Sequence, residues 1–114
     1  MKNARLPLEH IRQAMRFLLE HVHAKEDMEK DAVLRYAVER NFAVIGEAAK
    51  RIPESVRKEN PQIPWKEMAG MRDMIIHEYD EIDLDEVWGT IERDIPKALE
   101  GIDRLLEDSA SQRA

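Results

Sequence analysis

Hydrophobic residues recur every three or four positions along most of the chain, which is the spacing of one face of an α-helix. The first stripe begins near Pro7, a residue suited to a first helical turn, and consists of Leu8, Ile11, Met15, Leu18 and Val22. A second stripe predicts a helix over residues 31–52 and consists of Leu34, Val38, Ile45, Ala48, Ala49 and Ile52. The charged stretch 25–30 separates the two helices, and Pro53 ends the second.

The second half of the chain predicts two more main helices. Residues 54–64, which contain Pro61 and Pro64, are expected to form a short helical turn and a loop, and a third helix covers 65–78. The fourth begins at Asp83, which makes a capping-box-like pair with Glu86. Its apolar seam is Leu84, Trp88, Ile91, Ile95, Ala98, Ile102 and Leu105. Pro96 is expected to kink this helix, and residues 108–114 to fray. The pattern predicts an all-α, up-down bundle of four main helices plus a short helical turn, in a single domain over 1–114.

Composition narrows the class of protein. The chain has 114 residues, of which 43% are hydrophobic and 37% charged, and this length suits one domain. It has no cysteine, which excludes disulfides, a thiolate nucleophile and a cysteine-based zinc site. No apolar run approaches the ~18 residues that span a membrane, and the N-terminus lacks the apolar core of a signal peptide. A soluble, cytoplasmic protein without a membrane partner is expected.

The charge is unevenly distributed. The net charge is −6, but residues 1–70 carry 13 basic and 11 acidic side chains, whereas residues 71–114 carry 5 and 13. An acidic total argues against broad duplex binding and leaves room for a focused basic site in the N-terminal part. The best candidates for RNA contact are Arg35, Arg40, Lys50 and Arg51, followed by Arg57 and Lys58. A solvated helix face explains them equally well, because acidic residues lie between them.

The sequence predicts no metal site and no cofactor. His21 and His23 would point ~200° apart on a helix, so they cannot share a metal ion. The acidic run 80–86 lacks the ligand spacing of a calcium loop, since Ile82, Leu84 and Ile91 occupy its third, fifth and twelfth positions.

Candidate chemistry is concentrated in residues 72–79, which read Arg-Asp-Met-Ile-Ile-His-Glu-Tyr. His77 can act as a general acid or base near neutral pH, and Arg72 can stabilise a phosphate that gains charge in a transition state. On one continuous helix these two side chains would lie ~140° apart, so a second helix or a second copy of the chain would have to bring them to one cleft. Without further support, such a pair is more often an ordinary surface feature.

The same stretch resembles the R-x4-H-x-Y signature of the HepT-like toxins, a branch of the HEPN ribonuclease superfamily. Residues 43–50, Ala-Val-Ile-Gly-Glu-Ala-Ala-Lys, resemble the family's I-G-E-A-A block. Pro64-Trp65 followed by the Ala-Gly-Met-Arg of residues 69–72 resembles its approach to the active helix, and Asp94-Ile95-Pro96 resembles its D-[IL]-P step. These blocks occur in the family's order over about two-thirds of the chain.

The resemblance implies an HEPN-like fold and a metal-independent endoribonuclease that leaves 2′,3′-cyclic phosphate and 5′-hydroxyl ends. In that role His77 would move the protons, Arg72 would hold the scissile phosphate, and Asp73 would orient one of them. Many relatives have Asn where this chain has Asp73. HEPN proteins generally form two-fold homodimers in which both motifs face one cleft, which would bring Arg72 and His77 together.

The resemblance also implies a partner. HepT-like toxins are typically paired with a small nucleotidyltransferase antitoxin (MntA-like), which in part of the family transfers AMP to the motif tyrosine, and Tyr79 matches that position. Two alternatives remain: a non-catalytic helical binding partner of a nucleotidyltransferase, and a structural bundle in which the R-x4-H spacing is accidental.

Four other residues have structural interpretations. Gly46 is expected to permit close approach of another helix, and Glu47 to be a buried polar residue that hydrogen-bonds across the bundle. Trp65 and Trp88 are expected to anchor the core or an interface.

Overall fold

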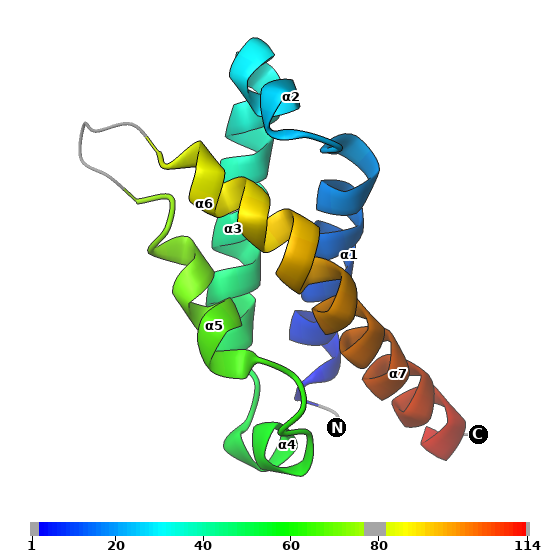
Figure 1. The fold of residues 1–114 in the computed structure, drawn as a ribbon. Helices are drawn as coiled ribbons and strands as arrows, with labels where there is room; N and C mark the ends of the chain where they lie inside the picture. Colours follow the sequence, from blue (N-terminus) through cyan, green and yellow to red (C-terminus); the bar gives the residue numbers. More distant parts are fainter. Residues whose placement is uncertain (1–2, 77–81, 114) are drawn as a thin grey trace.

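Helix α1 (Arg5–His21) and helix α3 (Ala32–Lys50) form the central pair of the bundle, and α1 also packs against α7 (Ile95–Arg113) (Figure 1). The structure is a computed structural model that describes residues 3–76 and 82–113, with side chains as far as residue 108. Within these ranges every regular element is helical, and the predicted all-α class is confirmed. None of the described helices is long and apolar enough to cross a lipid bilayer.

Both central helices begin close to their predicted starts. Helix α1 starts two residues before Pro7, which is tolerated because the first-turn backbone N–H groups have no partners inside a helix. Helix α3 starts after Asp31, whose carboxylate accepts hydrogen bonds from the backbone N–H groups of Val33 at 3.0 Å and Leu34 at 3.2 Å. This is the capping that an aspartate before an apolar stripe provides.

The charged stretch between the central helices forms helix α2 (Lys25–Lys30). The break itself lies at residues 22–24, where the Asp27 carboxylate accepts hydrogen bonds from the backbone N–H groups of His23 at 2.8 Å and Ala24 at 3.1 Å. Lys25 forms an ion pair with Asp85 of helix α6 (Leu84–Gly89), with an Nζ–Oδ1 distance of 2.9 Å. The hydrogen bond to Asp85 and the charge of Asp85 raise the pKa of Lys25. The ion pair connects α2 to α6 at the surface.

The predicted third helix is only partly correct. Residues 54–59 form the expected short helix α4 (Glu54–Glu59), and α5 (Trp65–Ala69) begins where predicted, with the Trp65 indole donating to the carbonyl of Asn60 at 2.9 Å. Beyond α5, however, the chain tightens into the 3-10 helix η1 (Gly70–Arg72) and then a turn over 73–75. The N–H groups of residues 73, 74 and 75 bond three residues back rather than four, so the α-helix predicted to reach residue 78 ends early.

The last helix is divided by a π-helical turn, η2 (Thr90–Asp94), which joins α6 to α7. Asp83 caps α6 as predicted, accepting a hydrogen bond from the backbone N–H of Glu86 at 3.1 Å. The π turn ends two residues before Pro96, whose missing N–H and ring would disturb regular α-helical bonding to the preceding turn. Helix α7 continues to Arg113, beyond residue 108, where the frayed tail is expected to begin.

The π turn also shifts the buried seam of this helix. The prediction is confirmed in the middle, where Ile91, Ile95, Ala98 and Ile102 are buried. It is wrong at the ends, where Val87 and Leu106 are buried while Leu84, Trp88 and Leu105 are only partly buried. A π turn contains one residue more than an α-helical turn. The buried position that precedes this turn is therefore residue 87 instead of residue 88.

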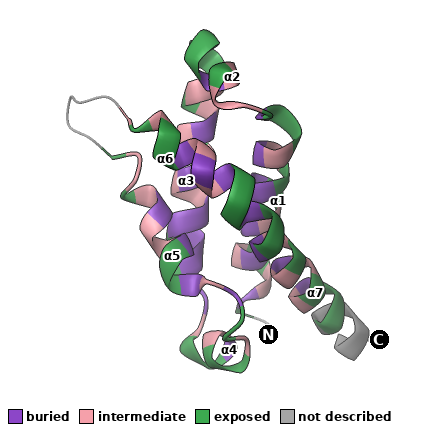
Figure 2. Cartoon of the chain, in the orientation of Figure 1, coloured by how far each residue is buried: buried purple, intermediate pink, exposed green. Residues whose placement is uncertain are grey.

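The core is one continuous cluster of buried apolar residues. All five residues of the first predicted stripe, Leu8 to Val22, are at most 3% exposed. The second predicted stripe is buried except for Leu34, and Phe42, which the prediction did not include, is also buried. Trp65 is buried, which confirms it as a core anchor, and Trp88 packs on the edge of the cluster. Figure 2 shows the buried faces of the helices turned toward one another, with exposed residues on the outside.

Candidate functional site

Arg72 occupies the last position of η1, where this segment packs directly on α3. A Cβ atom added at Gly46 of α3 would lie 2.8 Å from the backbone nitrogen of Arg72 and 2.9 Å from its Cβ. Side chains do not approach a backbone so closely, so this contact requires glycine. The prediction that Gly46 permits close approach is confirmed, and the element that it admits is the one that carries Arg72.

The residue after Gly46 holds the side chain of Arg72. Glu47 Oε1 lies 3.0 Å from Arg72 Nε, and the two side chains are 53% and 43% exposed. Glu47 therefore crosses to another element as predicted, but the expectation that it is buried is wrong. It lies at the rim of the bundle because α3 turns this face toward η1 and solvent. The sequence signal for this contact was the I-G-E block itself, in which the glycine admits η1 and the glutamate then lies beside it.

The ion pair leaves much of the guanidinium available. Glu47 contacts Nε, and among the described residues no other group pairs with Arg72. The two terminal amino groups can therefore donate together to two oxygens of one phosphate, which is the geometry that a planar guanidinium favours. Asp73, the neighbouring acid, is exposed and forms no ion pair with Arg72 in the described part of the chain.

His77 and Tyr79 lie outside the described residues. The ~140° separation expected for Arg72 and His77 assumed one continuous helix, and that assumption is wrong because the α-helical path ends before Arg72.

The four candidate RNA-binding residues fall into two groups. Arg35 donates from Nη1 to the carbonyl of Met28 at 2.9 Å, so this guanidinium links α3 to the end of α2. Arg40 and Arg51 line a cavity of ≈ 200 Å³ between α1 and α3, and Lys50 is exposed next to Arg51. The structure therefore brings Arg40 and Arg51 to one cavity with Glu47, the residue that pairs with Arg72, whereas Arg35 does not line this cavity.

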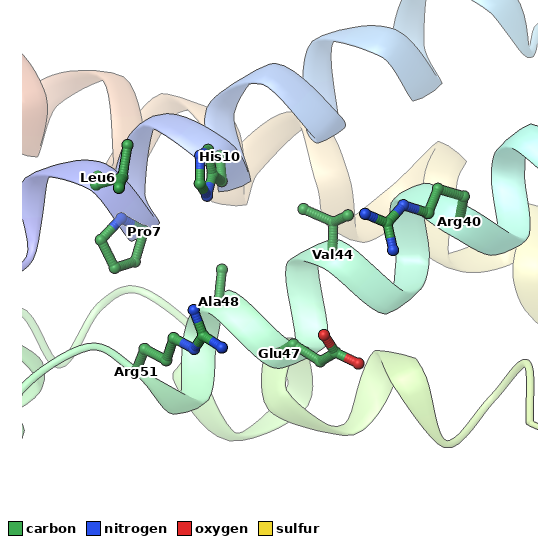
Figure 3. Close-up of a pocket in the computed structure, with 8 residues that line it drawn as sticks. All are labelled: Leu6, Pro7, His10, Arg40, Val44, Glu47, Ala48 and Arg51. Atoms are coloured by element: carbon green, nitrogen blue, oxygen red, sulfur yellow. The ribbon is translucent and has the colours of Figure 1, made fainter.

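This surface, which we call the α1–α3 cavity, is built from two helices (Figure 3). Helix α1 contributes Leu6, Pro7 and His10, and helix α3 contributes Arg40, Val44, Glu47, Ala48 and Arg51. The guanidinium groups of Arg40 and Arg51 extend along α3 toward each other, with Val44 and Ala48 between them. Sequence reasoning missed the α1 residues, because Leu6 and His10 lie off the apolar stripe of that helix.

No cluster of three or more histidine, aspartate or glutamate side chains that could hold a metal ion occurs in the described parts of the chain. The guanidinium groups of the described site can bind anions, and Arg72 is held in place by a carboxylate.

Comparison with known proteins identifies relatives along almost the whole chain. A family model described as "Ribonuclease HepT-like" matches residues 8–105. A "Putative RNase" of Caldanaerobacter subterraneus subsp. tengcongensis is 42% identical over 109 residues, which cover 94% of this chain and 97% of that protein. A "Probable ribonuclease HepT" of Thermococcus cleftensis is 45% identical over 71 residues, covering 62% of this chain and 64% of the relative.

A third relative is a "Putative RNase" of Methanocaldococcus jannaschii, 41% identical over 83 residues, which cover 73% of this chain and 69% of that protein. No solved structure matches the chain significantly. The matched range includes both the Gly46–Glu47 step and Arg72, so the contact between α3 and η1 lies within the shared region.

Proposed function

The chain belongs to the ribonuclease HepT-like family, and from this premise we propose that it is a metal-independent endoribonuclease that acts as the toxin of a toxin–antitoxin pair. It cuts RNA by attack of a ribose 2′-hydroxyl on the adjacent phosphorus, which leaves a 2′,3′-cyclic phosphate and a 5′-hydroxyl. Family membership supports the ribonuclease class, and the geometry around Arg72 supports its place in the site.

Arg72 carries this proposal, because its guanidinium is both held and accessible. Glu47 binds Nε at 3.0 Å, and the side chain is 43% exposed, so the terminal amino groups can reach a phosphate from solvent. Negative charge builds on the non-bridging oxygens as the 2′-oxygen attacks. A cation already oriented toward them lowers the energy of that state without reorganising at the moment of reaction.

His77 moves the protons in this scheme, as the family motif implies. A neutral imidazole accepts the 2′-hydroxyl proton, or a protonated imidazole donates to the leaving 5′-oxygen, and a group that titrates near neutral pH can do either. We assign Asp73 to orient His77, because Arg72 already has Glu47 as its carboxylate partner.

We further propose that two copies form a two-fold homodimer in which both motifs line one cleft. Arg72 lies at the rim of the bundle, so an opposing copy can approach it. The partner of the dimer is a nucleotidyltransferase antitoxin of the MntA type. Transfer of AMP to Tyr79 would place a negative phosphodiester near Arg72, where it competes with RNA phosphate.

The test is RNA cleavage by the purified, unmodified protein in excess EDTA, with tRNA and mRNA as substrates. We expect cyclic-phosphate ends, and we expect cleavage to disappear in His77→Ala and Arg72→Ala while both variants stay folded and retain the oligomeric state. Intact RNA after incubation with a folded protein whose Tyr79 is unmodified would overturn the nuclease. The non-catalytic partner of a nucleotidyltransferase would then be favoured.

A further inference from the structure

We propose that the α1–α3 cavity is a nucleotide subsite that binds single-stranded RNA beside the scissile phosphate, an inference that rests on the proposed ribonuclease function. Arg40 and Arg51 bind backbone phosphates there, and the apolar α1 wall and His10 receive a base. This subsite gives the enzyme affinity for substrate outside the reacting phosphate.

The cavity adjoins Arg72 through one shared residue. Glu47 lines the cavity and also binds Arg72 Nε at 3.0 Å. In Figure 3 its carboxylate points to the side of α3 away from α1, whereas the Arg40 and Arg51 side chains turn toward the cavity. Glu47 therefore lies between the cavity and Arg72, and an RNA strand whose phosphate rests on Arg72 has to pass Glu47 to place its next nucleotides in the cavity.

The charge of the cavity selects an anion. Arg40 and Arg51 are exposed and form no ion pair with any described residue, unlike Arg35, which is bonded to a carbonyl, and Lys58, which is paired with Glu54 at 3.3 Å. Two unpaired guanidinium groups above one cavity repel each other until an anion lies between them. Their backbone positions are eleven residues apart, or about 16 Å along the axis of α3, and the two side chains extend toward each other from there.

The shape and lining of the cavity suit a base. Leu6 is 61% exposed at the rim, and together with Pro7 and Val44 it forms an apolar surface beside the imidazole of His10. Unpaired bases stack on such surfaces, whereas the bases of a duplex are already stacked on each other. A volume of ≈ 200 Å³ is below that of pockets that enclose drug-sized ligands, so the cavity suits a group the size of a single base.

A second copy of the chain is a poorer occupant. In a two-fold interface the same patch meets itself, so Arg40 and Arg51 of both copies would be brought together. Glu47 is the one carboxylate that lines the cavity, and it is already engaged with Arg72. RNA supplies negative charge without this conflict.

The experiment measures binding of a 2′-O-methyl RNA oligonucleotide, which lacks the attacking hydroxyl, by fluorescence anisotropy at several salt concentrations. The test variant is Arg40→Ala/Arg51→Ala, and the matched control is Lys97→Ala/Arg104→Ala, which removes the same charge from exposed positions of α7, a helix that does not line the cavity. We expect about tenfold weaker binding for the test variant and little change for the control. The slope of log affinity against log salt should become shallower by about 0.7 for each lost phosphate contact.

The base contact is tested separately at His10. His10→Ala should weaken binding about fivefold or more, whereas His10→Phe, which keeps a stacking face, should retain it. On cleavable RNA, Arg40→Ala/Arg51→Ala should raise KM and leave kcat largely unchanged, because these residues do not contact the reacting phosphate.

Equal affinities for the test and control variants, in a protein that still cleaves RNA, would overturn the subsite and leave the nuclease standing. Conversion of a dimer to a monomer by Arg40→Ala/Arg51→Ala, seen by analytical ultracentrifugation, would show a protein interface and also overturn it. Failure of the wild-type protein both to bind and to cleave RNA would overturn the proposed function as well.

Discussion

The α1–α3 pair and the segment that carries Arg72 are held in place by different kinds of contact. The pair is joined by a broad layer of apolar side chains, among them Phe42, Ile45 and Leu18, which have no exposed surface. The η1 segment also buries Met71, but the position of Arg72 depends on one glycine and one half-exposed ion pair. The α1–α3 pair is stabilised by many apolar contacts, so it contributes most to the stability of the fold. The position of Arg72 depends on a few individual contacts, which set the geometry of the site.

The largest effect on stability is expected in the first region. Phe42→Ala removes a fully buried ring and should lower the free energy of unfolding by about 3–5 kcal/mol. Urea unfolding measures this, with Tyr36→Ala as the control, because Tyr36 is on the same helix and 65% exposed. The control should change stability by no more than about 0.5 kcal/mol. Similar losses for both variants would contradict the burial of Phe42.

Gly46→Ala should lower both stability and activity. The new methyl group would meet backbone and Cβ atoms of Arg72 that cannot move without shifting η1, so we expect a loss of about 1–3 kcal/mol. Displacement of Arg72 by even about 1 Å should reduce kcat up to about a hundredfold. Gly70→Ala is the matched control, since a Cβ at Gly70 meets nothing within 4 Å. If both variants cleave RNA equally well, the close contact does not position Arg72.

Glu47→Gln should have the smallest effect on stability and a clear effect on rate. The Glu47–Arg72 pair is about half exposed, so its loss should change the free energy of unfolding by less than about 1 kcal/mol. A less firmly held Arg72 should nevertheless lower kcat several-fold. The control is Glu54→Gln, which removes the exposed Glu54–Lys58 pair from α4. An unchanged kcat in Glu47→Gln would mean that Arg72 needs no carboxylate to orient it.

Periodic features of the fold were predictable, and features that depend on neighbouring elements were not. The stripe from Leu8 to Val22 and the cap at Asp31 follow from local spacing and hydrogen-bonding chemistry, and both are confirmed. The third helix was overextended, because local propensity does not register the three-residue hydrogen bonds that form over residues 73–75 where η1 ends. The Val87 register was missed because the π turn before Pro96 interrupts an otherwise regular seam.

The candidate site shows the same division. The sequence motifs identified Arg72 and Gly46 separately. They did not indicate that the two residues are in contact, because α3 and η1 are far apart in the chain. Arg40 and Arg51 were identified as basic residues together with Arg35, and nothing in the sequence indicated that only Arg35 would be bonded to a carbonyl. The assigned roles of Arg72, His77, Asp73 and Tyr79 stay predictions until cleavage is measured.

The amino-acid order was thus sufficient for the helical class, the inward face of α1 and most of that of α3, the family and the residue types of the chemistry. Each of these is a local or additive property, because helical periodicity and capping involve residues within a few positions of one another. The Glu47–Arg72 pair, the contact at Gly46 and the α1–α3 cavity arise only when folding brings distant helices together. Which side chains then meet depends on how the helices pack, and that packing is the sum of many weak contacts across the whole core.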